Sequence, residues 1–396
     1  MERNALNNKI VSSALITSFH SFIFGMNLAI FSTYKEIFVS DKRIASFMMT
    51  ETEFKHAVCV ICLGALLSNL CASMINIKRK NFLIINGMIN LIGQLCIKFA
   101  FSSFFIICAR FIIGIGAGLT TGLVPLYHLK LAPLHLKGLF GSLNQLFCVI
   151  GVFFAQIYSF YFNKESNWQI GQNFTLLFVG LHFLSCFFII KVEENSVQLP
   201  NKNIIQLISN PNARKSILII TMILIGQQIS GIKSIIFYSE EIFKKTGNSH
   251  LYIAFLGISL ILGTIVSMFI IDKAGRKKLL LISSLVAAGN LFLLALNKFI
   301  FFAIFGFVIG YSIGLGPIPW FIAGEGYPED YKEAGSTLGI SANWLTNYTV
   351  ALNFPILLNY STKHAFLPLF VHSFFYFSLF LFYFLRLKEG KLIFCD

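Results

Sequence analysis

The chain has 396 residues, of which 56% are hydrophobic and only 12% are charged. About a quarter of the residues in a soluble domain are charged, so this composition indicates a protein that lies mostly in a lipid bilayer. The net charge of +14 does not indicate a nucleic-acid partner, because Lys and Arg lie in short loops between apolar runs and form no separate basic domain.

Twelve apolar segments are long enough to cross a bilayer, which takes about 20 mostly apolar residues. They cover roughly residues 10–32, 56–76, 82–102, 104–128, 139–162, 172–190, 216–239, 250–271, 279–297, 299–323, 335–359 and 365–386. The sequence therefore predicts an all-α membrane protein with twelve transmembrane helices.

The distribution of basic residues predicts how these helices are oriented. An even number of helices places both termini on one side of the membrane, and 19 of the 31 Lys and Arg residues fall on that side. Cytoplasmic loops carry the excess of basic residues in membrane proteins. We therefore expect cytoplasmic termini in a multi-pass membrane protein. The plasma membrane is the expected location, and an organellar membrane is the alternative.

Charged motifs recur at a nearly constant offset in the two halves of the chain. Arg79 follows the second predicted helix as Arg276 follows the eighth, and Lys137 follows the fourth as Lys332 follows the tenth. Transporters built from two parallel repeats show such internal similarity and bind their substrate between the repeats. We expect an N-terminal six-helix half over residues 1–190, a short cytoplasmic linker over 191–215 and a C-terminal half with a short tail over 216–396.

The seventh predicted helix contains a polar stretch, Gln227–Tyr238, inside an apolar segment. Two adjacent amides, Gln227 and Gln228, are followed by a lysine, Lys233. An unsatisfied polar group in hydrocarbon costs several kcal/mol, so such side chains usually face a bundle interior or a water-filled cavity. This stretch is therefore a candidate functional site.

The eight cysteines and eight histidines do not predict a metal or redox centre. Cys59 and Cys62 form a C-x-x-C pair, but they lie on a predicted membrane helix and no second pair accompanies them. The histidines show no ligand spacing, and His20 in the first helix is expected to be hydrogen-bonded within the protein. No nucleophile–base pair is evident either. We expect no metal, no cofactor and no enzymatic activity.

Several motifs in both halves together resemble a known family, the sugar porters of the major facilitator superfamily, and above all the facilitative glucose transporters. The motifs are Arg110–Tyr127, Gly138–Gln156, Gln227–Tyr238, Asp272–Lys277, Gly316–Glu325 and Asn343–Asn347. The resemblance implies the twelve-helix fold of that superfamily. It also implies transport of a hexose, with glucose as the first expectation, by alternating access.

The resemblance implies a sugar site between the two halves. In the family, amides hold the sugar hydroxyls and aromatic rings flank the sugar, which suits a neutral solute because Gln and Asn both donate and accept hydrogen bonds. The positions that match are Gln145, Gln227, Gln228, Trp320, Asn343 and Trp344. For any one of them, and for Asn347, a hydrogen bond between helices is the alternative role.

Lys233 departs from the family pattern, which has Asn at this position. Leu260 and Ser312 likewise stand where the family has a binding Asn and a binding Glu. Two interpretations of Lys233 stay open. The side chain extends toward an aqueous cavity and hexose binding is kept, or it contacts the substrate and selects another solute, such as a sugar acid or a sugar phosphate.

Charged residues at the inner ends of the helices form a second group that the resemblance implies. In the family, such residues clasp the two halves together when the transporter faces outward. The corresponding positions here are Lys130, Lys137, Arg276, Lys277, Glu325 and Lys332. Lys130 replaces a glutamate of the family, so we expect it to pair with Glu329, Asp330 or Glu333 in the opposing loop.

The first helix favours facilitated diffusion. Proton-coupled relatives carry an Asp there, whereas this chain has Asn27 and no Asp or Glu between Val11 and Tyr34. An amide cannot take up a proton. Proton-coupled symport is the alternative, and a non-transporting sugar sensor is disfavoured because the predicted C-terminal tail is short. The expected partners are a small sugar and the lipid bilayer, and the sequence identifies no protein partner.

Overall fold

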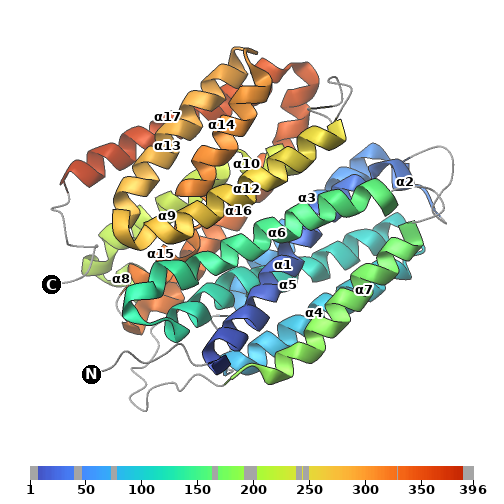
Figure 1. Cartoon of the computed structure of the whole chain (residues 1–396), viewed down its shortest axis with the longest axis horizontal. Coiled ribbons are helices and arrows are strands. Elements are labelled where there is room, and N and C mark those ends of the chain that lie inside the picture. Colours follow the sequence, from blue (N-terminus) through green and yellow to red (C-terminus); the bar gives the residue numbers. More distant parts are fainter. Residues whose placement is uncertain are drawn as a thin grey trace. The chain divides into compact units, whose positions relative to one another are not determined.

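The computed structural model describes residues 8–39, 47–72, 78–162, 168–190, 203–237, 243, 249–327 and 329–386. Every regular element in these ranges is a helix, as Figure 1 shows. The predicted all-α class is therefore confirmed for this part of the chain. The chain divides into two compact units, Met1–Gln198 and Leu199–Asp396.

The first unit contains six long helices, which match the first six predicted segments. They are α1 (Asn8–Thr33), α3 (Glu51–Ala72), α4 (Arg79–Lys98), α5 (Ser103–Leu131), α6 (Lys137–Phe162) and α7 (Trp168–Ser185). Three short elements accompany them in the described residues: α2 (Lys35–Val39) after α1, and the 3-10 turns η1 (Leu134–Leu136) before α6 and η2 (Cys186–Phe188) after α7.

Glycines let two helix pairs of the first unit pack at very short range. A Cβ on Gly64 of α3 would collide with the backbone oxygen of Phe111 on α5, and a Cβ on Gly25 of α1 would collide with the backbone oxygen of Cys148 on α6. Small residues allow such approach, and van der Waals packing holds membrane helices together where lipid is as apolar as the side chains. These glycines fix how α1, α3, α5 and α6 pack within this unit.

The second unit repeats the pattern with two of its helices broken. Its elements are α9 (Arg214–Ile229), α10 (Ile232–Phe237), α12 (Ser249–Ala274), α13 (Arg276–Ala295), α14 (Ile300–Ile313), α15 (Ile318–Glu325), α16 (Lys332–Tyr360) and α17 (Thr362–Arg386). The seventh predicted segment breaks between α9 and α10 at Gly231, whose φ is 81°. The tenth breaks between α14 and α15, where Gly314, Gly316 and Pro317 interrupt the helix.

By length and composition, ten segments among the described residues are long and apolar enough to cross a membrane. The two other predicted spans correspond to α16 and α17. Several Asn, Ser and Thr residues lower the hydropathy of α16, and α17 contains an apolar helix over Ala365–Ser378. All twelve predicted segments are thus helical, while the cytoplasmic orientation of the termini stays a prediction.

The predicted linker, 191–215, falls partly outside the described residues, because 191–202 are not described. Its remainder contains the short helix α8 (Ile204–Ser209), the 3-10 turn η3 (Pro211–Ala213) and the start of α9. Asn203 and Gln206 make reciprocal capping hydrogen bonds at the start of α8. Ile205 and Ile208 are exposed on α8 while Leu207 is buried. The expected short helix is therefore present, and its position on the membrane surface stays a prediction.

Candidate functional site

Gln227, near the helix break after α9, hydrogen-bonds to the backbone at the other helix break of the second unit. Its Nε2 donates hydrogen bonds to the carbonyl oxygens of Leu315 (2.9 Å) and Gly316 (3.1 Å), both in the turn between α14 and α15. A broken membrane helix frees carbonyl groups that need new partners, since hydrocarbon supplies none. Gln227, at the end of α9, therefore stabilises the interrupted backbone of the tenth predicted segment.

Asn343 on α16 completes a network of three buried amides. Its Nδ2 donates to the oxygen of Leu224 (2.7 Å) and to Oε1 of Gln227 (2.9 Å), and its Oδ1 accepts from Nε2 of Gln228 (3.0 Å). Gln227, Gln228 and Asn343 are all at most 1% exposed. The predicted amides do come together, and their hydrogen bonds hold α9 against α16 and against the turn between α14 and α15.

Several buried polar atoms of α9, α10 and α16 have hydrogen-bonding capacity that this network does not use. Oε1 of Gln228, Oγ of Ser234 and both amide atoms of Asn347 are buried and have no hydrogen-bond partner within the described residues. Asn347 lies one helical turn from Asn343, so the two side chains share a face of α16. Asn347 was absent from the predicted binding set, although its i, i+4 spacing from Asn343 was a usable signal. Geometrically it is better placed to receive a ligand than Asn343.

The predicted tryptophans and Lys233 also lie in the second unit. Trp320 on α15 and Trp344 on α16 are buried, with 4% and 1% exposure. Lys233 on α10, just past the break at Gly231, is 8% exposed. Gln145 belongs to α6 of the first unit and is also buried. Its meeting with the amides of the second unit stays a prediction.

The two other positions that depart from the family pattern offer no free polar group. Leu260 on α12 is a fully buried apolar side chain. Ser312 on α14 donates its hydroxyl to the oxygen of Val308 in its own helix, at 2.8 Å. Neither side chain replaces the amide or carboxylate that the family carries there.

A second buried polar network lies in the first unit around Arg110 of α5. Its Nη1 donates to the oxygen of Asn27 (2.8 Å) and its Nε to the oxygen of Ala57 (3.1 Å), while its guanidinium lies 4.7 Å from the ring centroid of Phe31. The side-chain oxygen of Asn27 accepts a hydrogen bond from Gln94. Carbonyls and a ring thus surround this arginine, and its Nη2 has no partner in the described part of the chain.

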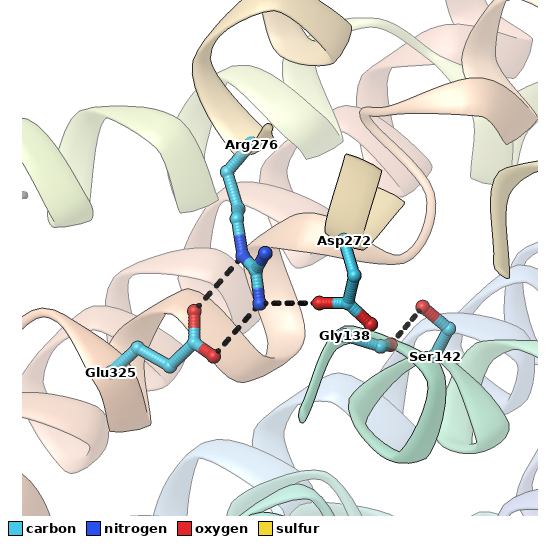
Figure 2. Close-up of polar contacts among 5 residues, drawn as sticks. All are labelled: Gly138, Ser142, Asp272, Arg276 and Glu325. Atoms are coloured by element: carbon cyan, nitrogen blue, oxygen red, sulfur yellow. Dashed lines mark hydrogen bonds and ion pairs between the residues drawn. The ribbon is translucent and has the colours of Figure 1, made fainter. Parts of the chain in front are cut away.

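Arg276 is the centre of the charged cluster in the second unit (Figure 2). It forms an ion pair with Asp272 at 2.9 Å and a two-pronged contact with Glu325, at 3.2 and 3.3 Å. These residues belong to α13, α12 and α15. Gly275, with a φ of 85°, makes the turn that brings Asp272 and Arg276 together. Two of the predicted clasp residues, Arg276 and Glu325, are therefore in contact within one unit, and their part in a clasp between the halves stays a prediction.

The other predicted clasp residues lie at helix ends. Lys130 is near the end of α5, Lys137 begins α6, Lys277 is in the first turn of α13 and Lys332 begins α16. Lys130 is exposed and the other three are partly buried. The pairing of Lys130 with the acidic residues of the second unit stays a prediction.

Comparisons with known proteins agree with this organisation. The model of the family described as "Sugar (and other) transporter" matches residues 13–194 and 189–393. Facilitated glucose transporter member 3 of solute carrier family 2 is 31% identical in Gallus gallus over 330 residues, covering 70% of this chain and 66% of the relative. The Homo sapiens protein of that name is 27% identical over 425 residues, covering 90% and 86%.

Solved structures share the fold. The proton:xylose symporter XylE bound to 6-bromo-6-deoxy-D-glucose superposes with a TM-score of 0.80 at 18% identity, covering 98% of each chain. XylE from E. coli in a partially occluded inward-open conformation gives 0.77 at 19% identity, covering 97% of this chain and 100% of that one. At this identity the likeness supports the twelve-helix fold of the major facilitator superfamily. Both family matches and fold identify a multi-pass membrane transporter and not an enzyme. The chain belongs to the sugar (and other) transporter family.

Proposed function

We propose that this protein carries a hexose, with D-glucose as the first candidate, across the plasma membrane by facilitated diffusion. The proposed halves are residues 1–190 and 216–396, which alternate between outward and inward access around a sugar held by amides. The named relatives are facilitated glucose transporters, which supports this substrate class. Gln145 would supply the first half's amide, and Trp320 and Trp344 would flank the sugar.

The observation that carries the proposal is the partly satisfied amide network. Gln227 and Asn343 are bound to the scaffold, whereas Gln228 Oε1 and the amide of Asn347 keep free donors and acceptors. Buried polar groups without partners are costly unless a ligand or water completes them. A sugar hydroxyl both donates and accepts, so it satisfies a carbonyl oxygen and an amide nitrogen equally well. The uncharged character of these groups fits a neutral sugar.

Uniport is supported by the surroundings of Arg110. In the described residues its hydrogen bonds go to the backbone oxygens of Asn27 and Ala57. Neither partner binds a proton at physiological pH, so this network offers no carrier for proton coupling. An Asn27→Asp change would place a titratable group there. We expect that variant to acquire a pH-dependent transport rate that the native chain lacks.

Uptake into proteoliposomes tests the proposed substrate. Purified protein is reconstituted, and initial uptake of radiolabelled D-glucose is measured against L-glucose, with empty liposomes as the background. We expect saturable uptake of the D-isomer alone, reduced in a Gln228→Ala variant. Equal entry of both isomers, or D-glucose uptake that does not exceed the background, contradicts the proposal.

Lys233 supports a second candidate, a sugar that carries an acid or phosphate group. This lysine is buried just past the break in the seventh predicted segment, close in sequence to the unpartnered Ser234. Buried cations favour anionic partners. Competition of D-glucose uptake by glucuronate and by glucose 6-phosphate separates the candidates. The hexose proposal predicts weak competition by both anions.

We also propose that Arg276 and Glu325 act with Lys130, Lys137, Lys277 and Lys332 at the cytoplasmic ends of the halves. The ion pairs of Arg276 support this role because they fix the ends of α12, α13 and α15 relative to one another. Rigid helix ends are needed if charged side chains of one half are to meet those of the other in only one state. A Lys130→Glu variant should weaken the outward-facing state, and unchanged exchange kinetics would count against the role.

A further inference from the structure

Three potential metal ligands come together inside the first unit, at a place that the sugar site does not involve. His20 lies on α1, His182 on α7, and Cys186 begins η2 directly after α7. The Sγ of Cys186 is 3.5 Å from Nε2 of His20 and 3.6 Å from Nε2 of His182. All three donor atoms lie within 4.8 Å of one another, and all three side chains are buried.

The two sulfur–nitrogen distances match those of a metal site. Zinc binds thiolate sulfur at about 2.3 Å and imidazole nitrogen at about 2.0–2.1 Å, which puts sulfur and nitrogen roughly 3.5 Å apart around a tetrahedral ion. We propose that His20, His182 and Cys186 bind a thiophilic metal ion, Cu⁺ or Zn²⁺. Soft thiolate together with imidazole selects these ions over Mg²⁺, Ca²⁺ or Mn²⁺, which prefer oxygen ligands.

The net charge of the occupied site differs between Cu⁺ and Zn²⁺. Binding breaks the S–H bond of Cys186, forms one metal–sulfur and two metal–nitrogen bonds, and releases one proton to solvent, without any change of oxidation state. Cu⁺ with one thiolate leaves the site neutral, whereas Zn²⁺ leaves one positive charge. Isolated charge is expensive in a buried, apolar setting. The site therefore favours Cu⁺, and Zn²⁺ binds more tightly only where a further anionic ligand, such as hydroxide, joins it.

The surroundings of His182 suit Nε2 ligation. Nδ1 of His182 lies 3.4 Å from the hydroxyl oxygen of Ser185, whose own hydrogen goes to the oxygen of His182 at 2.7 Å. Nδ1–H can therefore donate to Ser185 and leave the Nε2 lone pair to the metal, an arrangement typical of metal-binding histidines. Nδ1 of His20 faces Nδ2 of Asn86 on α4 at 3.4 Å, and that amide also donates to Oγ1 of Thr120 and accepts from Nδ2 of Asn90. Asn86 therefore presents a donor to His20, and ligation through Nε2 of His20 requires the ring proton to lie on Nδ1.

Hydrogen bonds alone satisfy the three donor atoms of the cluster less completely than a bound metal ion does. The thiol of Cys186 has one hydrogen, yet Sγ is near both Nε2 atoms and also 3.3 Å from the oxygen of His182. Two buried imidazole rings, 4.3 Å apart at their centroids, converge on that single sulfur. A bound ion satisfies both nitrogens and the sulfur together. It also joins α1 to the end of α7, the first and last long helices of this unit.

Metal binding by the full-length chain tests the proposal. Purified protein in detergent is stripped with chelator, then titrated separately with Zn²⁺ and, under reducing conditions with a competing Cu⁺ chelator, with Cu⁺. Bound metal per chain is measured by mass spectrometry. We expect about one equivalent of Cu⁺ in the native chain, a melting temperature that rises with metal, and loss of both effects in Cys186→Ser and His182→Ala.

The matched control is Cys148→Ser, which removes another buried cysteine on α6 outside the cluster and should keep the equivalent of metal. Size-exclusion chromatography confirms that each variant is folded. A native chain that binds no more metal than the Cys186→Ser variant overturns the proposal and leaves a hydrogen-bonded cluster. Binding that survives in both cluster variants also overturns it. One equivalent of Zn²⁺ with no Cu⁺ contradicts the charge argument alone.

Discussion

Two asparagines on one face of α16 should respond to truncation in opposite ways. Asn343→Ala removes three hydrogen bonds and leaves Gln227 Oε1 and Gln228 Nε2 without these partners in a buried setting. Hydrogen bonds between membrane helices average about 0.6 kcal/mol, and leaving a buried group unpaired costs about 1–3 kcal/mol. The expected loss of stability is therefore roughly 2–5 kcal/mol.

Asn347→Ala breaks no hydrogen bond among the described residues. Its expected loss of stability is smaller than that of Asn343→Ala, because the packing atoms lost from this buried position are offset by removal of an amide that has no partner in the described part of the chain. If Asn347 binds the sugar, its loss should weaken D-glucose affinity by about tenfold, which corresponds to roughly 1.4 kcal/mol or one to two hydrogen bonds.

Unfolding titrations in mixed micelles measure the stability of both variants, and equilibrium binding of radiolabelled D-glucose measures affinity. Asn353→Ala is the matched control, because Asn353 is exposed on the same helix and donates only to Thr349 of its own helix, at 2.8 Å. The reasoning is refuted if Asn347→Ala destabilises the protein as much as Asn343→Ala does, or if it binds glucose as tightly as the native chain.

Three further substitutions test separate parts of the structure. Gly231→Ala should lower the free energy of unfolding by about 1–2 kcal/mol or more, because Gly231 has a φ of 81° and a Cβ there would collide with Leu369. Unfolding titration measures this change, and an unchanged midpoint would show that alanine fits this backbone conformation without strain. Arg276→Ala should lower the melting temperature more than Arg276→Lys, since only arginine makes the two-pronged contact with Glu325; equal effects would argue against that contact. Lys233→Asn should change glucose affinity by less than about tenfold, because one net hydrogen bond is worth roughly 0.5–1.5 kcal/mol; complete loss of glucose binding would show that Lys233 is essential to the site.

Helix positions were predictable because length and apolarity determine a membrane span almost alone. All twelve segments were predicted from the sequence, but the seventh and tenth were predicted as continuous helices. The break at Gly231 depends on a left-handed backbone conformation, and glycine in a membrane helix more often serves close packing, as Gly25 and Gly64 do here. Composition could not separate these two uses of glycine.

The candidate site was predictable in its residue types but less so in their roles. Gln227, Gln228 and Asn343 were all identified from their motifs. Which amide is consumed by the scaffold depends on distances between helices far apart in sequence, so Asn343 and Asn347 could not be ranked beforehand.

The cluster of His20, His182 and Cys186 was even harder to predict from the sequence than the roles of the amides. The expectation of no metal site rested on linear ligand spacing, and these ligands are separated by most of the first unit. Only His182 and Cys186 share a short spacing, and one such pair on an apolar helix does not indicate a metal site. The fold, and not the local sequence, brings the third ligand to them.

Counterflow in proteoliposomes tests the central proposal most directly. Vesicles loaded with unlabelled D-glucose are diluted into a trace of labelled D-glucose, first at equal pH on both sides and then with an acidic exterior. Facilitated diffusion predicts a transient accumulation of label in the loaded vesicles at equal pH. In control vesicles that hold no sugar, it predicts that the proton gradient causes no accumulation of label. Absence of counterflow for any hexose would contradict hexose transport, and uphill uptake driven by the proton gradient alone would contradict uniport.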